Sequence, residues 1–361
     1  MKMRKIVCSF MISVLCFMTA ISGVSATSYD TSKINAAYSK VVEYYKNNNN
    51  LNNADKILAV ESLGLEAESN QFDTSSADLS STSLSKKIVT EVLLGVDPTE
   101  DKKTLESQID ENGNVEGSWG ASSDVWTLYA LYVTSSEKAN LIVNKLNDEL
   151  AASSVCGYEW GGTYYADYDT TGWVIEGLAV VNKEKYATTI NKAIDYIKNN
   201  TTMTTTGWVT ADNVDTQSQV LEGMFAYDTN ALLNDSYTVH PVDCLLNTQL
   251  SDGSFPSGYN AEYTTAEVAK TLGTYKNGSV FEKAKKAYDK MMNPEQPDNT
   301  KPAQPTDTKK DSQSTNKVET TNQKTTSVKT GDETNVVIFV SLSMVSGGLF
   351  LVLRKEYERV H

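Results

Sequence analysis

The stretch DTTGWVIEGL, residues 169–178, recurs three more times in the chain. Its counterparts are SSDVWTLYAL (122–131), DTQSQVLEGM (215–224) and YTTAEVAKTL (263–272). The last residues of successive copies lie 47, 46 and 48 positions apart. Each copy follows a turn that holds glycine and an aromatic residue, such as GSWG at 117–120. A fixed period of this length is typical of stacked helical arrays.

The body of the chain, residues 27–292, is predicted to be all-α. Apolar residues recur there at intervals of three and four, the spacing that places them on one face of a helix. Four of the seven prolines lie beyond the body, between residues 293 and 334. Because proline interrupts helices, its scarcity in the body favours helices throughout.

Three motifs of the body add a family resemblance: the DYDTT helix start (167–171), the DGSF turn (252–255) and the TTA helix start (264–266). They resemble the repeat of prenyltransferases and squalene cyclases, which also occurs in secreted bacterial proteins and in transcobalamin-like vitamin carriers. The resemblance covers residues from about 33 to 292. It implies an α/α toroid of about six helix pairs, in which outer helices surround inner helices and a central cavity.

A stripe of polar and aromatic residues is expected along the recurring helices. With about 100° of rotation per residue, the positions two, five and nine before the last residue of each copy point the same way. Apolar residues such as Leu128 and Ile175 point the other way. The candidate ligand-binding residues of this stripe are Trp126, Tyr129, Asp169, Trp173, Glu176, Gln219, Glu222, Tyr263 and Glu267.

Two interpretations of the stripe are open. If the recurring helices are inner helices, the stripe lines the cavity, and its carboxylates and aromatic rings suit a sugar, a peptide or a cationic ligand. If they are outer helices, the stripe is a solvated face, as polar helix faces usually are.

Three carboxylates are weak catalytic candidates. Asp169 matches the acid in the Asp-x-Asp-Asp motif of class II terpene cyclases, although Thr170 replaces the last aspartate. The simpler interpretation is that Asp169 caps its helix and stays ionised with a lowered pKa. Glu176 and Glu222 would supply the acid pair of a glycoside hydrolase. Their equivalent positions in two repeats favour an architectural role instead.

We expect neither a metal site nor a cofactor. His240, Asp243 and Cys244 are the residue types that bind zinc in protein prenyltransferases, but they crowd onto one helix start. The thioester motif of complement-type toroids, GCGEQ, is missing from the sequence. Whether Cys156 and Cys244 form a disulfide after export stays open.

Both ends of the chain are predicted to be targeting segments. Residues 1–26 have the basic start, apolar run and small-residue exit of a secretory signal peptide. Residues 293–334 are rich in proline, threonine and lysine and lack aromatic residues, so we expect a disordered linker. Residues 335–353 are apolar enough for a transmembrane segment, and residues 354–361 form a basic cytoplasmic tail.

The pair Thr330-Gly331 precedes the apolar segment and resembles the sorting signal that sortases read in Gram-positive bacteria. In that family the enzyme cuts between Thr and Gly and joins the Thr to the cell wall. Ser327 and Val328 replace the usual Leu-Pro start, so a plain membrane anchor is the alternative. In both cases we expect an exported protein on the surface of a Gram-positive-type bacterium.

Charge narrows the functional hypotheses. The chain has 46 acidic and 32 basic residues, a net charge of −14, and would repel a phosphate backbone, which excludes nucleic-acid binding. The sequence favours a non-catalytic ligand-binding or adhesive domain for an extracellular glycan, peptide or corrinoid-like ligand. The alternatives are a carbohydrate-active enzyme, a terpene cyclase-like enzyme and a structural spacer.

Overall fold

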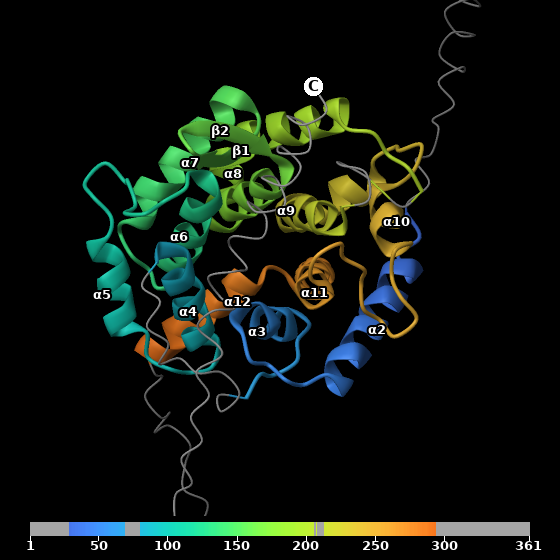
Figure 1. Cartoon of the computed structure of the whole chain (residues 1–361), viewed down its shortest axis with the longest axis horizontal. Helices are drawn as coiled ribbons and strands as arrows, with labels where there is room; N and C mark the ends of the chain where they lie inside the picture. The colour runs from blue at the N-terminus through green and yellow to red at the C-terminus, as the bar shows by residue number, and fades with distance from the viewer. Residues whose placement is uncertain (1–28, 69–79, 206, 208–212, 294–361) are drawn as a thin grey trace, which may run out of the picture. The chain divides into compact units, whose positions relative to one another are not determined.

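A computed structural model describes residues 29–68, 80–205, 207 and 213–293 of the chain. Within these ranges the chain forms eleven helices, labelled α2 to α12, and one two-stranded sheet (Figure 1). All of them belong to the first of two compact units, Met1–Asp298, and the second unit, Asn299–His361, lies outside the described residues. The prediction of a mostly helical body is confirmed.

Six helices contact one another in a closed series (Figure 1). They are α3 (Ala54–Ser62), α4 (Ser81–Leu93), α6 (Ala121–Val133), α8 (Tyr168–Asn200), α9 (Val214–Asn234) and α11 (Ala261–Asn277). Each of these helices packs against the next, and α11 packs against α3. The four recurring segments form the first turns of α6, α8, α9 and α11. We call these six the inner helices.

The remaining helices pack against the inner helices. They are α2 (Ser32–Asn47), α5 (Thr99–Ser107), α7 (Ala139–Ser153), α10 (Pro241–Leu246) and α12 (Val280–Met292). Helix α2 packs on α10 and α11, α5 on α4 and α6, and α7 on α6 and α8. Helices α8 and α9 each bend where the backbone leaves helical geometry, at Asn182 and Asp228. Each of the two is therefore an inner helix that continues into a second helical segment.

Polar side chains cap three of the recurring helices, two or three residues before the recurring segment begins. Asp167 accepts the backbone N–H of Thr170 at 2.7 Å, while Asn213 and Asn260 cap α9 and α11. Side-chain caps of this kind satisfy backbone N–H groups that have no partner inside the helix. The prediction that Asp169 caps α8 is wrong, because the cap lies two residues earlier and Asp169 belongs to the first helical turn.

The prediction of helices throughout the body is wrong for residues 156–167. Strands β1 (Cys156–Trp160) and β2 (Thr163–Asp167) form an antiparallel hairpin there. Its turn, Gly161 and Gly162, has φ values of 57° and 77°, which glycine adopts without strain. The strands are rich in tyrosine, threonine and tryptophan, whose side chains favour strands over helices.

The structure bears on the possible disulfide but not on the terminal targeting segments. Cys156 and Cys244 are both buried and unbonded, so the structure contains no disulfide between them. Among the described residues, no helix has the length and hydropathy needed to cross a membrane. The expected signal peptide, linker, transmembrane segment and basic tail lie outside the described residues.

Two glycines allow α8 and α9 to approach closely. A Cβ atom on Gly172 would lie 2.5 Å from the carbonyl oxygen of Gln219, closer than any normal contact. A Cβ atom on Gly223 would meet the carbonyl oxygen of Gly172. Because both positions meet backbone atoms and not flexible side chains, neither helix can accommodate a methyl group without moving. The close approach therefore sets the distance between the stripe residues of α8 and those of α9.

We predict that Gly172→Ala destabilises the protein by about 2 kcal/mol or more, since overpacking of this kind usually costs about 1–3 kcal/mol. Alanine in a helix is otherwise favoured over glycine by about 0.5–1 kcal/mol, so a loss of stability would isolate the steric contact. Chemical denaturation measures the change, with Gly258→Ala as the control because a Cβ atom at that position would have no neighbour within 4 Å. A Gly172→Ala protein as stable as the control would contradict the close packing.

Candidate functional site

The inner helices carry the stripe in layers because they run in the same direction. The side-chain amide of Gln219 donates to Glu267 Oε2 at 3.3 Å, and the hydroxyl of Tyr129 donates to Glu176 Oε2 at 3.1 Å. Residues at similar distances from their helix starts therefore face each other. Three layers follow along the stripe. The N-terminal layer is Ser122, Asp169, Asp215 and Tyr263; the middle layer is Trp126, Trp173, Gln219 and Glu267; and the deep layer is Tyr129, Glu176, Glu222 and Lys270.

The deep layer is fully buried and connected. The Tyr129 hydroxyl lies 3.1 Å from Glu176 Oε2. The ammonium group of Lys270 lies 3.7 Å from Glu222 Oε2 and 3.1 Å from Glu267 Oε2 of the layer above. All these side chains are 1% exposed or less. The interpretation of the stripe as a solvated outer face is therefore wrong.

Burial sets the ionisation of the deep layer. It raises the pKa of Glu176 and, more strongly, that of Glu222, because a carboxylate loses the stabilisation of water. For Lys270 burial acts in the opposite direction, but the carboxyl groups of Glu222, Glu267 and Glu176 outweigh it and raise the lysine pKa. The charged ammonium group of Lys270 therefore lies among carboxyl groups, and two of these, Glu176 and Glu222, are shifted toward the protonated form.

Helix α12 closes the deep layer from the side of the helix C-termini. The hydroxyl of Ser279, which caps α12, lies 2.7 Å from Glu176 Oε1. The ring of Phe281 stacks on that of Tyr129, with centroids 3.6 Å apart and planes 5° from parallel. These contacts fill the interior beneath the stripe and hold Glu176 and Tyr129 in place.

The middle layer is largely buried but incompletely paired. The atoms Trp173 Nε1, Gln219 Oε1 and Glu267 Oε1 are buried and have no hydrogen-bond partner among the described residues. Leaving a buried polar atom unpaired costs about 1–3 kcal/mol, so native structures contain few of them. The middle layer holds three such atoms, one donor and two acceptors, while the deep and N-terminal layers hold one acceptor each, Glu222 Oε2 and Asp215 Oδ1.

Trp126, the fourth residue of the middle layer, has no atom among these buried unpaired polar atoms. Its side chain is 2% exposed, and its ring contacts those of Tyr129, Trp173 and Phe281 edge to face. The ammonium groups of Lys86 and Lys270 lie 4.4 and 5.4 Å from the Trp126 ring centroid. Its ring is therefore occupied by protein groups, and its role is packing.

The N-terminal layer is more open to solvent than the two layers below. Asp169 and Tyr263 are half-buried, and Asp215 accepts a 2.5 Å hydrogen bond from the exposed Tyr259. Burial, followed by the charge of Asp167, raises the pKa of Asp169 to about 7. The expectation that Asp169 is held ionised with a lowered pKa is therefore wrong.

The structure thus brings the nine candidate ligand-binding residues together along one stripe and divides them by depth. Glu176 and Glu222, the candidate acid pair, lie in the deep layer, and Asp169 lies in the N-terminal layer. Sequence reasoning missed Asp55 and Lys86, which form a 2.8 Å ion pair, and Ser279 of α12. The signal for the first two is weak, because α3 and α4 do not carry the recurring motif.

The residues weighed as a zinc site have structural roles. His240 caps α10 by accepting the backbone N–H of Val242, Asp243 accepts the hydroxyl of Tyr29 at 2.6 Å, and Cys244 donates to the carbonyl oxygen of Thr204. Among the described residues, no group of three or more His, Cys, Asp or Glu side chains is arranged to hold a metal ion.

Comparison of the chain with protein-family models, curated proteins and solved structures finds no match.

We predict that the Glu222→Gln protein gains stability relative to the wild type as pH rises above about 4.5. A carboxyl group whose pKa is raised on folding stabilises the fold below its unfolded pKa and loses that contribution as pH rises through the folded pKa. Glutamine has no such loss, so the difference grows by up to about 1.4 kcal/mol per pH unit. Urea denaturation between pH 4.5 and 8 measures it.

The matched control for this series is Glu184→Gln, at an exposed position of α8. Its difference from the wild type should change little across the same pH range. A Glu222→Gln difference that stays flat, or that falls with rising pH, would show that Glu222 is ionised in the folded protein.

Proposed function

We propose that this chain is a surface-displayed, non-catalytic ligand-binding protein, which binds an extracellular ligand at the N-terminal and middle layers of the stripe. The observation that carries the proposal is the set of three unpaired polar atoms, Trp173 Nε1, Gln219 Oε1 and Glu267 Oε1. A ligand that brings both acceptors and donors would satisfy all three. Sugars and peptides have both kinds of group.

The depth of the acids favours binding over catalysis. A catalytic carboxyl group must touch its substrate, whereas Glu176 and Glu222 are buried beneath the middle layer. Their partners are protein groups: Tyr129 and Ser279 for Glu176, and Lys270 for Glu222. Such pairing is typical of a fixed structural network.

The second candidate function is a carbohydrate-active enzyme, and the observation in its favour is Asp169. This carboxyl group is half-buried, its pKa is raised to about 7, and Asp215 lies near enough to contribute to that shift. A protonated acid beside a second carboxyl group is the arrangement of a glycoside hydrolase. The match of Asp169 to the terpene cyclase acid is a weaker alternative, because Thr170 replaces the last aspartate of that motif.

We infer further that the helical body is an α/α toroid. The closed series of contacts among six inner helices supports this fold, as does the recurrence of the same motif in α6, α8, α9 and α11. An array of this kind presents the starts of its inner helices at one end. A ligand would approach the stripe from that end.

We also propose that the chain is exported and anchored at the cell surface. The support is the sequence of segments outside the described residues: the leader (1–26), the linker (293–334), the apolar segment (335–353) and the basic tail (354–361). The linker would hold the binding body away from the membrane.

The binding proposal predicts that Trp173→Phe weakens the ligand about three- to tenfold, because it removes one hydrogen-bond donor worth about 0.5–1.5 kcal/mol. The screen uses cell-wall glycans, peptidoglycan fragments, cationic peptides and a corrinoid, followed by calorimetry on the ligands that bind. The control is Tyr196→Ala, at an exposed position of α8. Equal affinity of the wild type and Trp173→Phe proteins would remove the stripe as the binding site.

The same screen separates the two candidate functions. Turnover of a glycan that stops in Asp169→Asn would favour the enzyme over the binding protein. Binding without turnover would favour the non-catalytic assignment.

The anchor proposal predicts that Thr330→Ala abolishes wall-linked protein, because a sortase needs the bond between Thr330 and Gly331. Immunoblots of wall and membrane fractions measure the distribution, with Thr326→Ala as the matched control. Unchanged wall linkage of Thr330→Ala would contradict the sorting signal. Absence of wall linkage in both the wild type and the control would indicate a plain membrane anchor.

A further inference from the structure

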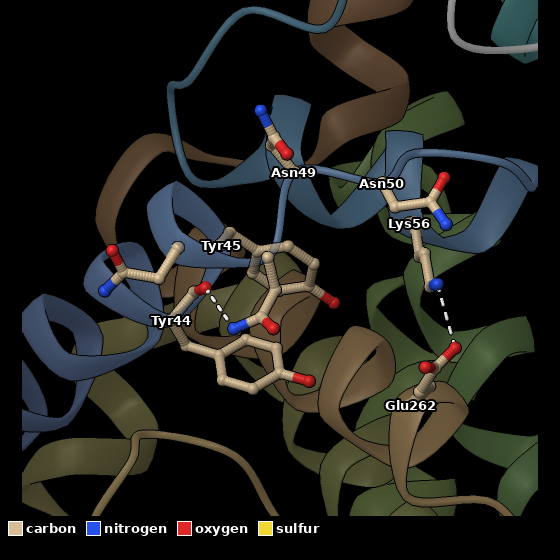
Figure 2. A pocket seen from close by; sticks show the side chains of 8 residues that line it. Tyr44, Tyr45, Asn49, Asn50, Lys56 and Glu262 are labelled. Atoms are coloured by element: carbon tan, nitrogen blue, oxygen red, sulfur yellow. Dashed lines mark hydrogen bonds and ion pairs between the residues drawn. The ribbon is translucent and has the colours of Figure 1, made fainter.

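A pocket of about 280 Å³ lies between the end of α2, the loop that follows it and the start of α11 (Figure 2). It lies outside the stripe described above. Its lining residues are Tyr44, Tyr45, Asn47, Asn48, Asn49, Asn50, Lys56 and Glu262. The volume is slightly below the roughly 300–1,000 Å³ of pockets for drug-sized ligands. It therefore suits a ligand of about the size of one sugar ring.

Two tyrosines form one side of the pocket. Their rings meet edge to face, with centroids 5.3 Å apart, and Figure 2 shows both hydroxyls turned toward the Lys56–Glu262 side. Tyr45 as a whole is 4% exposed, but its hydroxyl is not fully enclosed and makes no hydrogen bond within the described residues, so it is open to the pocket. Burial, followed by the charges of Tyr44, Asp55 and Glu267, raises the pKa of Tyr45, so this hydroxyl stays protonated and can donate. A hydroxyl that no protein group uses and that faces a pocket is available to donate to a ligand.

The opposite side of the pocket has no net charge. Lys56 and Glu262 form an ion pair at 2.8 Å, so their charges cancel (Figure 2). Asn49 and Asn50 are exposed lining residues, and the amide of each offers donors and an acceptor. A neutral lining favours neither an anion nor a cation. Amides that both donate and accept match hydroxyl groups, which also do both.

The amide nitrogens of the two preceding asparagines bond within the protein. The side chain of Asn48 donates to the carbonyl oxygen of Tyr44 at 2.9 Å and so ends α2, and Asn47 donates to Glu43 at 3.3 Å. This arrangement fixes the position of Tyr44 at the last turn of α2. The half-buried Tyr44 ring then gives the C–H groups of a sugar ring a flat apolar surface.

We propose that this pocket is a binding subsite for one uncharged sugar residue. The ring of Tyr44 contacts the apolar face of the sugar, the hydroxyl of Tyr45 donates to it, and the amides of Asn49 and Asn50 bind its hydroxyl groups. Because the pocket has its own ring faces and amides, it can bind sugar even if the stripe binds nothing.

The test is an NMR titration of the full chain in detergent micelles with methyl β-glucoside, and with methyl β-glucuronide as the charged counterpart. We expect saturable binding of the neutral glycoside in the millimolar range, and weaker binding of the glucuronide. Tyr44→Ala should weaken the neutral glycoside at least tenfold. Asn50→Ala, an exposed position that leaves the helix end intact, should weaken it about threefold.

Two controls separate this subsite from the stripe. Trp173→Phe and Tyr196→Ala should leave methyl β-glucoside binding unchanged, whatever their effect on other ligands. If Tyr44→Ala does not fold, Asn50→Ala carries the test alone. No saturable binding of the neutral glycoside, binding that Asn50→Ala does not change, or tighter binding of the glucuronide would each overturn the proposal.

Discussion

The interior of this protein depends on one buried ammonium group. Lys270 stands within 3.7 Å of Glu222 and 3.1 Å of Glu267, in a region where all three side chains are excluded from water. Removing one member of a buried ion pair typically costs about 3–5 kcal/mol, because the remaining charge is left without a partner. Lys270 thus pairs with Glu267 within α11 and contacts the carboxyl group of Glu222 on α9, and Ser279 and Tyr129 hold Glu176 in the same layer.

This paired layer gives the rest of the stripe a rigid base. Above it, Trp126 is packed among aromatic rings and lysines, while Trp173, Gln219 and Glu267 keep unpaired polar atoms. Above these, Asp169 and Tyr263 reach partly into solvent. Exposure therefore increases from the deep layer to the N-terminal layer, and the middle layer holds the largest share of the unpaired polar atoms of the stripe. A binding site at one end of a helical array needs a fixed base, polar contacts and an approach from solvent.

The recurring helices and their layers follow from the sequence, because the helical period alone decides which side chains share a face. The helical period cannot predict which residues from other helices pack over a side chain. Lys86 of α4 covers Trp126, and α12 closes the deep layer, yet neither helix carries the recurring motif. The helix cap was placed two residues too late, since Asp167 and Asp169 are both suitable caps by residue type.

The hairpin and the pocket were missed for a related reason. Residues 156–167 lie between two helices of the repeat. The sequence indicates the turn there from its glycines and aromatic residue, but the helical period was extended over the strand-forming side chains on both sides of that turn. The pocket combines Tyr44 and Tyr45 with Glu262, which are more than 200 residues apart in sequence. No local pattern shows that contact. Only the closure of α2 against α11 creates it.

The most direct test of the account is a crystal structure of the protein soaked with a ligand identified by binding. Electron density for the ligand should lie within hydrogen-bond distance of Trp173 Nε1, Gln219 Oε1 and Glu267 Oε1, with the Lys270 network unchanged beneath it. A ligand located elsewhere, with these three atoms fully satisfied by ordered water or by each other, would contradict it.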